Sequence, residues 1–105
     1  MQVENKRLLI ELERAMREVN RDTLNPLFEK ITPEEMQPII QMVATARGKY
    51  LEELFKLSRI PTENLKLNTE TVKKLRFARL IYDELLEASK ALDIAIERGY
   101  LDVEL

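Results

Sequence analysis

Apolar and polar residues recur along most of the chain with the three- and four-residue spacing of amphipathic helices. The longest such stretch covers residues 69–98, which contain neither proline nor glycine and are rich in strong helix formers. Asn68 or Thr69 can cap its start, and Gly99 supplies the left-handed residue that commonly ends a helix. We expect one long helix whose core face consists of Ala78, Ile81, Leu85, Ala88, Leu92 and Ile96.

Two earlier helices are predicted near residues 3–21 and 33–59. The first has an apolar stripe of Leu8, Leu9, Leu12, Ala15, Met16 and Val19. The second begins with Thr32 as a cap, Pro33 at the first helical position and an acid three residues after the cap. Pro38 predicts a kink or a short opening turn in it. Its main stripe consists of Met36, Ile39, Ile40, Val43, Tyr50, Leu54 and Leu57.

A second apolar line on this helix consists of Ala44, Gly48, Leu51 and Phe55. Because glycine in mid-helix costs about 1 kcal/mol relative to alanine, we expect a neighbouring helix to approach closely at Gly48. The connection at residues 23–31 is more apolar than a solvent-exposed loop usually is. Its apolar residues are therefore expected to cover one end of a bundle: Leu24, Leu27, Phe28 and Ile31. After Gly99, Leu101 is expected to do the same, and the final residues are expected to be loose.

The predicted fold class is all-α: an antiparallel three-helix bundle in up-down-up order, forming one domain over residues 1–105. No apolar run approaches the roughly 20 residues that cross a bilayer, so no membrane is expected. Acidic residues interrupt the only apolar run near the N-terminus, which argues against a signal peptide and favours a cytoplasmic protein.

The residue types that are missing exclude much catalytic chemistry. The chain contains no cysteine and no histidine, which removes thiolate catalysis, the commonest general base and the commonest transition-metal ligand. With only two glycines it has no phosphate-binding loop. We therefore expect a non-catalytic protein with no cofactor and no metal. An enzyme built around Arg47, Tyr50 and Tyr82 is the third hypothesis.

A side stripe on the long helix indicates a partner surface. It consists of Phe77, Leu80, Ala91 and Ile94. One alternative is that a helix contacting two neighbours needs a wide apolar face. Basic residues fill the first third of the helix and acids dominate the rest, so two antiparallel copies would oppose unlike charges. We expect an interaction module (an adaptor, assembly factor or regulatory subunit) that forms a homodimer through this helix.

Nucleic-acid binding is the alternative hypothesis. It rests on the basic cluster Lys73, Lys74, Arg76 and Arg79, with Phe77 among these residues. The net charge of −2 argues against a generally basic nucleic-acid-binding domain, although a local patch is compatible with it.

Overall fold

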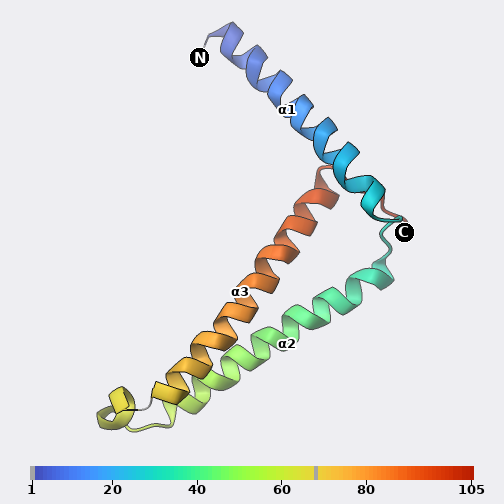
Figure 1. Ribbon diagram of the computed structural model, residues 1–105. Coiled ribbons are helices and arrows are strands. Elements are labelled where there is room, and N and C mark those ends of the chain that lie inside the picture. Colours follow the sequence, from blue (N-terminus) through green and yellow to red (C-terminus); the bar gives the residue numbers. More distant parts are fainter. Residues whose placement is uncertain (1, 68) are drawn as a thin grey trace. The chain divides into compact units, whose positions relative to one another are not determined.

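The computed structural model describes residues 2–67 and 69–105, and these residues form three α-helices (Figure 1). Helix α1 spans Val3–Leu24, α2 spans Pro33–Ser58 and α3 spans Thr69–Glu97. Two 3-10 helices, η1 (Asn25–Leu27) and η2 (Thr62–Leu67), lie in the connections. The described residues include no β-strand; an isolated parallel bridge joins Ile31 and Val103. The predicted all-α class and the three predicted helices are therefore confirmed, and α1 runs past residue 21 to Leu24.

Local capping chemistry explains where α2 begins and where α3 ends. The backbone N–H of Glu35 donates to the Thr32 hydroxyl at 3.4 Å, so Thr32 caps α2 as its sequence predicts. After α3, Gly99 has φ of 73°, and the N–H of Tyr100 donates to the Ala95 carbonyl at 2.8 Å. The Gly99 N–H donates to the Ile96 carbonyl, which completes a Schellman cap. Asn68, a predicted cap for α3, lies outside the described residues; Thr69 is the first residue of the helix.

Pro38 does not divide α2. The helix continues from Pro33 to Ser58 with Pro38 inside it, so the predicted short opening turn is wrong. Pro38 lies in the second turn of the helix, close to the first turn, where the backbone N–H groups lack helical partners. Pro38 is nevertheless the sixth residue of the helix, so its missing N–H removes the bond that would otherwise reach the Glu34 carbonyl.

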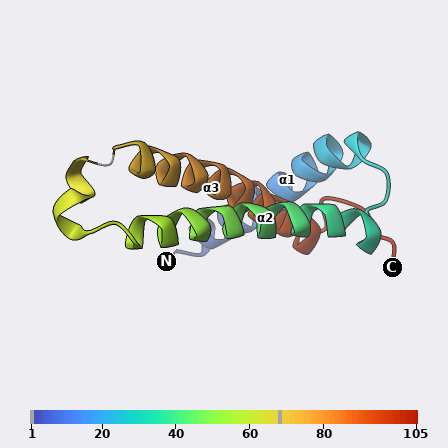
Figure 2. The same ribbon diagram turned by 90° about the horizontal axis from the view of Figure 1, so that it is seen from below.

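The chain divides into two compact units. The first unit is Met36–Ala91, and the second consists of the segment ending at Glu35 together with Leu92–Leu105. In the first unit, α2 and α3 run side by side in opposite directions (Figures 1 and 2). The rings of Tyr50 and Tyr82 lie 5.9 Å apart between their centroids, which places the two helices in contact there. The packing of these two helices is thus established, whereas the arrangement of all three in one bundle stays a prediction.

The buried line on each helix follows alternating spacings of three and four residues, as in a coiled coil. On α2 the buried or half-buried positions in this unit are Met36, Ile39, Val43, Ala46, Tyr50, Glu53 and Leu57. On α3 they continue through Leu75, Ala78, Tyr82, Leu85 and Ser89. Part of the predicted core is wrong, because Ile40, Leu54, Ile81 and Ala88 are exposed.

The second unit has a small core at the end of α3. Ala95, Tyr100 and Leu101 are buried together, and Leu24, Ile31 and Leu92 pack against them. The tail is held by backbone bonds: the Ile31 N–H donates to the Asp102 carbonyl, and the Glu104 N–H donates to the Ile31 carbonyl, both at 2.9 Å. Leu101 is buried, but the expectation of a loose tail is wrong for residues 102–104.

Several apolar residues predicted to lie in a core are exposed. Leu27 and Phe28 are exposed, whereas Leu24 and Ile31 of the same connection are half-buried. Helix α1 has no buried residue. The large residues of its stripe (Leu8, Leu9, Leu12, Met16 and Val19) are between 50% and 62% exposed.

The expectation of close helix packing at Gly48 is also wrong. Apart from its chain neighbours and the backbone of its own helix, a Cβ atom built on Gly48 would meet nothing within 4 Å, and its neighbours in the second apolar line, Leu51 and Phe55, are exposed. A Cβ atom on Gly99 would likewise meet nothing within 4 Å, but this residue has a positive φ. Substitution of Gly48 therefore tests helix propensity, whereas substitution of Gly99 tests backbone strain.

We predict that Gly48→Ala stabilises the protein by about 1 kcal/mol, because alanine is the better helix former and has room for its methyl group. Gly99→Ala should destabilise it by roughly 1–2 kcal/mol, because alanine disfavours the left-handed conformation. Urea denaturation followed by circular dichroism measures both effects. A loss of stability in Gly48→Ala would show that another helix does approach this position.

Candidate functional site

A buried carboxylate occupies a core position of α2. Glu53 is 2% exposed and lies on the buried line between Tyr50 and Leu57. Its Oε1 atom accepts hydrogen bonds from Lys49 Nζ at 3.1 Å and Lys56 Nζ at 3.4 Å. Lys49 and Lys56 lie four residues before and three residues after Glu53, so one helix face brings both ammonium groups to it. The charge of Glu53 is therefore paired within α2.

The electrostatics of this group follow from these bonds. The hydrogen bond from Lys49 lowers the pKa of Glu53, and the bond from Lys56 acts in the same direction against the effect of burial. Hydrogen bonds to Glu52 and Glu53 raise the pKa of Lys56. Both shifts favour the charged forms, so Glu53 is an anion and Lys56 a cation at neutral pH.

Glu53 lines a hollow of about 530 Å³ between α2 and α3. Ala78 and Ile81 supply apolar surface from α3, and the exposed ring of Phe77 lies beside them. The lining residues carry four lysines and one glutamate, so the hollow is basic: Lys49, Glu53, Lys56, Lys73, Lys74, Phe77, Ala78 and Ile81.

The structure brings the predicted basic cluster to this region. Lys73 and Lys74 line the hollow, whereas Arg76 and Arg79 line a second one of about 350 Å³, together with Lys73, Phe77 and Leu80. Exposed acids of the same helix lie near two of these cations, with Lys73 Nζ 3.7 Å from Glu70 and Arg79 Nε 3.9 Å from Asp83. Such exposed pairs are weak, so they leave the cations available to other anions.

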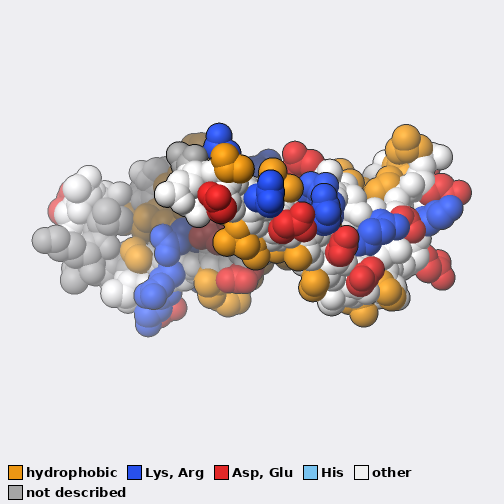
Figure 3. All heavy atoms as spheres, turned by 90° about the horizontal axis from the view of Figure 1, so that it is seen from above, with side chains coloured by type: hydrophobic (Ala, Val, Ile, Leu, Met, Phe, Trp, Pro, Cys, Tyr) orange, Lys and Arg blue, Asp and Glu red, His pale blue; other side chains and the backbone are white. Residues whose placement is uncertain are grey.

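The side stripe predicted as a partner surface is exposed. Phe77 is 65%, Leu80 57% and Ile94 44% exposed, and Ala91 is exposed as well. Helix α2 therefore leaves these residues uncovered, and the alternative, that the wide apolar face of α3 contacts two neighbouring helices, stays a prediction. Figure 3 shows hydrophobic side chains exposed among charged ones on one face of the molecule.

The three residues considered for an enzyme lie together. Arg47 Nε donates to the Tyr82 hydroxyl at 3.1 Å, and its guanidinium carbon lies 5.5 Å from the centre of the Tyr82 ring. The Tyr50 ring, also from α2, packs against the Tyr82 ring. Arg47 is exposed, as expected for a side chain that reaches the edge of the core. This arrangement ties α2 to α3 by a cation–π contact and a hydrogen bond.

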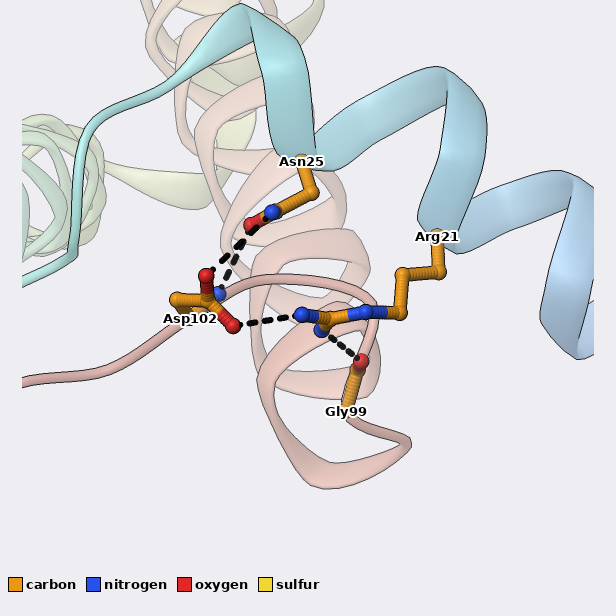
Figure 4. A network of polar contacts seen from close by, with 4 residues as sticks. All are labelled: Arg21, Asn25, Gly99 and Asp102. Atoms are coloured by element: carbon orange, nitrogen blue, oxygen red, sulfur yellow. Dashed lines mark hydrogen bonds and ion pairs between the residues drawn. The ribbon is translucent and has the colours of Figure 1, made fainter.

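A polar network holds the tail in the other unit (Figure 4). Arg21 donates to the Gly99 carbonyl at 2.9 Å and to the Asp102 carboxylate at 2.6 Å. Asn25 donates to the same carboxylate at 3.3 Å and accepts the Asp102 N–H at 3.0 Å. The bond from Arg21, followed by that from Asn25, lowers the pKa of Asp102.

Sequence reasoning missed Glu53, although the sequence contains a signal for it. Strict alternation of three and four residues through Val43, Ala46, Tyr50 and Leu57 places position 53 in the core. Lysines at 49 and 56 are the partners that a glutamate at such a position requires. The predicted stripe instead followed large apolar residues and passed through Leu54.

Among the described residues, no group of three or more acidic side chains is placed to hold a metal ion. No helix in the described part of the chain has the length and apolarity needed to cross a membrane. Comparison of the chain with known protein families, curated proteins and solved structures finds no match.

We predict that Asp102→Asn destabilises the protein at neutral pH and that its deficit disappears in acid. The folded-state pKa of Asp102 lies below its ordinary value of 3.8, so the carboxylate stabilises the fold above that pH. This stabilisation is lost as the pH falls below 3.8 through the folded-state pKa. Thermal melts of both proteins between about pH 7 and pH 3 measure the difference. A deficit that persists unchanged at the acid end would contradict the prediction, and Asp93→Asn, an exposed acid on α3, is the control.

Proposed function

We propose that this protein is a non-catalytic protein–protein interaction module, an adaptor, assembly factor or regulatory subunit that works as a homodimer. The observation that carries the proposal is the exposure of ordered amphipathic helices. The apolar stripe of α1 is at least half exposed, and no residue of that helix is buried. Large apolar residues grouped on one helix face are typical of surfaces that bind other proteins.

The length of α1 strengthens this argument. Most helical stability in proteins comes from packing an amphipathic face against other elements and not from helix propensity. α1 has 22 residues, and its apolar stripe runs from Leu8 to Val19. A partner that covers the stripe would supply the missing packing energy. The predicted up-down-up bundle, completed by a second copy, is the arrangement that we propose for this cover.

Charge order on α3 selects the orientation of the proposed dimer. Basic residues lie in the first third of the helix, and acids such as Glu87, Asp93 and Glu97 follow. Two antiparallel α3 helices would set Lys73, Arg76 and Arg79 of one copy against those acids of the other. A parallel pair would oppose like charges, so the order disfavours it. Leu80 and Ile94 would supply the apolar contact, worth roughly 1.5–3 kcal/mol for each fully buried side chain.

We predict that the wild type is a dimer at concentrations of tens of micromolar and that Leu80→Glu combined with Ile94→Glu makes it monomeric. The charged side chains would occupy the apolar contact of the dimer, whereas both positions are exposed in the single chain, so the helical content should be unchanged. Light scattering after size exclusion measures the mass, and circular dichroism measures the helix content.

A matched double substitution on α1, Leu12→Glu with Met16→Glu, tests whether the stripe of that helix contributes. A monomer with the α3 substitutions and a dimer with the α1 substitutions would assign the contact to α3. The converse result would move the contact to α1. A wild-type mass of one chain would exclude the homodimer.

A further inference from the structure

The exposed apolar stripe of α1 has acidic residues along both of its edges. At about 100° per residue, Glu11 and Glu18 follow one edge of the stripe and Glu13 follows the other. All three glutamates are exposed, and the arginines of α1 lie farther round the helix from the stripe. A surface that covers α1 should therefore combine apolar side chains with a basic rim.

The hollow between α2 and α3 has this combination. Phe77, Ala78 and Ile81 form its apolar surface, and Phe77 and Ile81 are 65% and 42% exposed. Lysines line it from both helices: Lys49, Lys56, Lys73 and Lys74. The acidic edges of α1 and the basic rim of the hollow are thus complementary in charge, and both apolar surfaces need cover. Two α1 helices paired with each other would instead bring acidic edges together, which disfavours that pairing.

Contacts within the second unit hold α1 at the end of α3. Leu24 packs against the core that contains Ala95. Nearer the N-terminus of α1, Glu13 lines a hollow of about 450 Å³ together with Arg98 and Tyr100, which follow the last residue of α3. From Leu24 toward its N-terminus, α1 therefore leads past the end of α3 and away from the start of that helix.

The hollow between α2 and α3 lies near the start of α3. Ile81 precedes Ala95 by 14 residues (81 to 95), a rise of roughly 21 Å along a helix. The contacts of α1 in the second unit thus keep its stripe from the hollow of the same chain. In the antiparallel α3 pair proposed above, by contrast, the first third of one α3 faces the last third of the other. This pairing sets the hollow of one copy beside the α1 of the other.

We propose that the two copies of the dimer exchange their first helices, so that α1 of each copy lies along the α2–α3 hollow of the other. The stripe of α1 covers Phe77 and Ile81 of the second copy, and the acidic edges of α1 meet the lysines of the rim. One α1 together with α2 and α3 of the other chain completes the up-down-up bundle that the sequence predicts. The inference rests on the homodimer proposed above and names the surface that covers α1.

Cross-linking between cysteine variants of the full chain tests the exchange. The chain has no cysteine, so each introduced thiol is the only one in its chain. Leu12→Cys protein is mixed with Ile81→Cys protein, allowed to exchange subunits and treated with a short bismaleimide. We expect a covalent pair that contains one chain of each variant, identified by mass spectrometry. Leu51→Cys replaces Ile81→Cys in the control, because Leu51 is 45% exposed on α2 but does not line the hollow, and it should give no such pair.

The other possible covers of α1 give different products. A chain that carries both Leu12→Cys and Ile81→Cys and cross-links within itself would show that α1 covers the hollow of its own chain. Efficient linkage of Leu12→Cys protein to itself would show that two α1 helices pair. Either result overturns the exchange. A dimeric mass without the pair of Leu12→Cys and Ile81→Cys chains overturns the exchange and leaves the homodimer standing, whereas a wild-type mass of one chain excludes the homodimer itself.

Charge reversal tests the contact of the acidic edge with the basic rim. Glu11→Lys and Lys74→Glu should each raise the dissociation constant of the dimer roughly three- to tenfold, because an exposed ion pair has a small effect and a symmetric dimer contains it twice. The two substitutions in one chain should restore part of the affinity, since neither residue belongs to the α3 contact. Arg14→Glu, on the far face of α1, should leave the dissociation constant unchanged. Single reversals without effect, or a combination without rescue, overturn the exchange. Sedimentation equilibrium measures the dissociation constants, and thermal melts verify that each variant folds.

Discussion

The contact between α2 and α3 is the interaction on which the arrangement of the first unit depends. It follows alternating spacings of three and four residues, with the small residues Ala46 and Ala78 as its most buried apolar members. A pair of helices can bury only the side chains that lie between them. No large side chain is fully buried among the described residues, so each helix keeps apolar surface on its outer side. The exposed side chains are thus a direct consequence of two-helix packing.

The second unit is held differently, by polar groups around a very small apolar core. Arg21 and Asn25 bind Asp102, and the backbone of Ile31 pairs with the tail on both sides of Val103. These bonds require the chain to reverse after α3, and the positive φ of Gly99 allows it. A short tail without regular structure is therefore ordered by satisfying its own backbone groups.

Much of the secondary structure could be predicted, because helix formers, Thr32 and Gly99 act locally. The buried faces were predicted less well. Amphipathic spacing identifies a stripe but does not say whether another helix covers it, which is why α1 was assigned to a core that the structure does not show. The expectation of close helix packing at Gly48 failed for a related reason, since a glycine in a helix indicates close packing only where a neighbouring helix approaches it. In the candidate site, the basic residues and Phe77 were found from their proximity on one helix. The contribution of α2, above all Glu53, depends on which residues face α3.

Glu53 also limits how the two helices can slide along each other. A shift of α3 by seven residues would preserve the apolar pattern, so hydrophobic packing alone would tolerate it. Such a shift would put Glu70 or Glu84 where Phe77 now lines the hollow, beside the buried Glu53 carboxylate. It would also replace Lys74 with Leu67 or Ile81. A slipped helix pair would thus gain repulsion between like charges and lose a cation. A single acidic residue in the core therefore makes one alignment of an otherwise repetitive interface distinct from its neighbours.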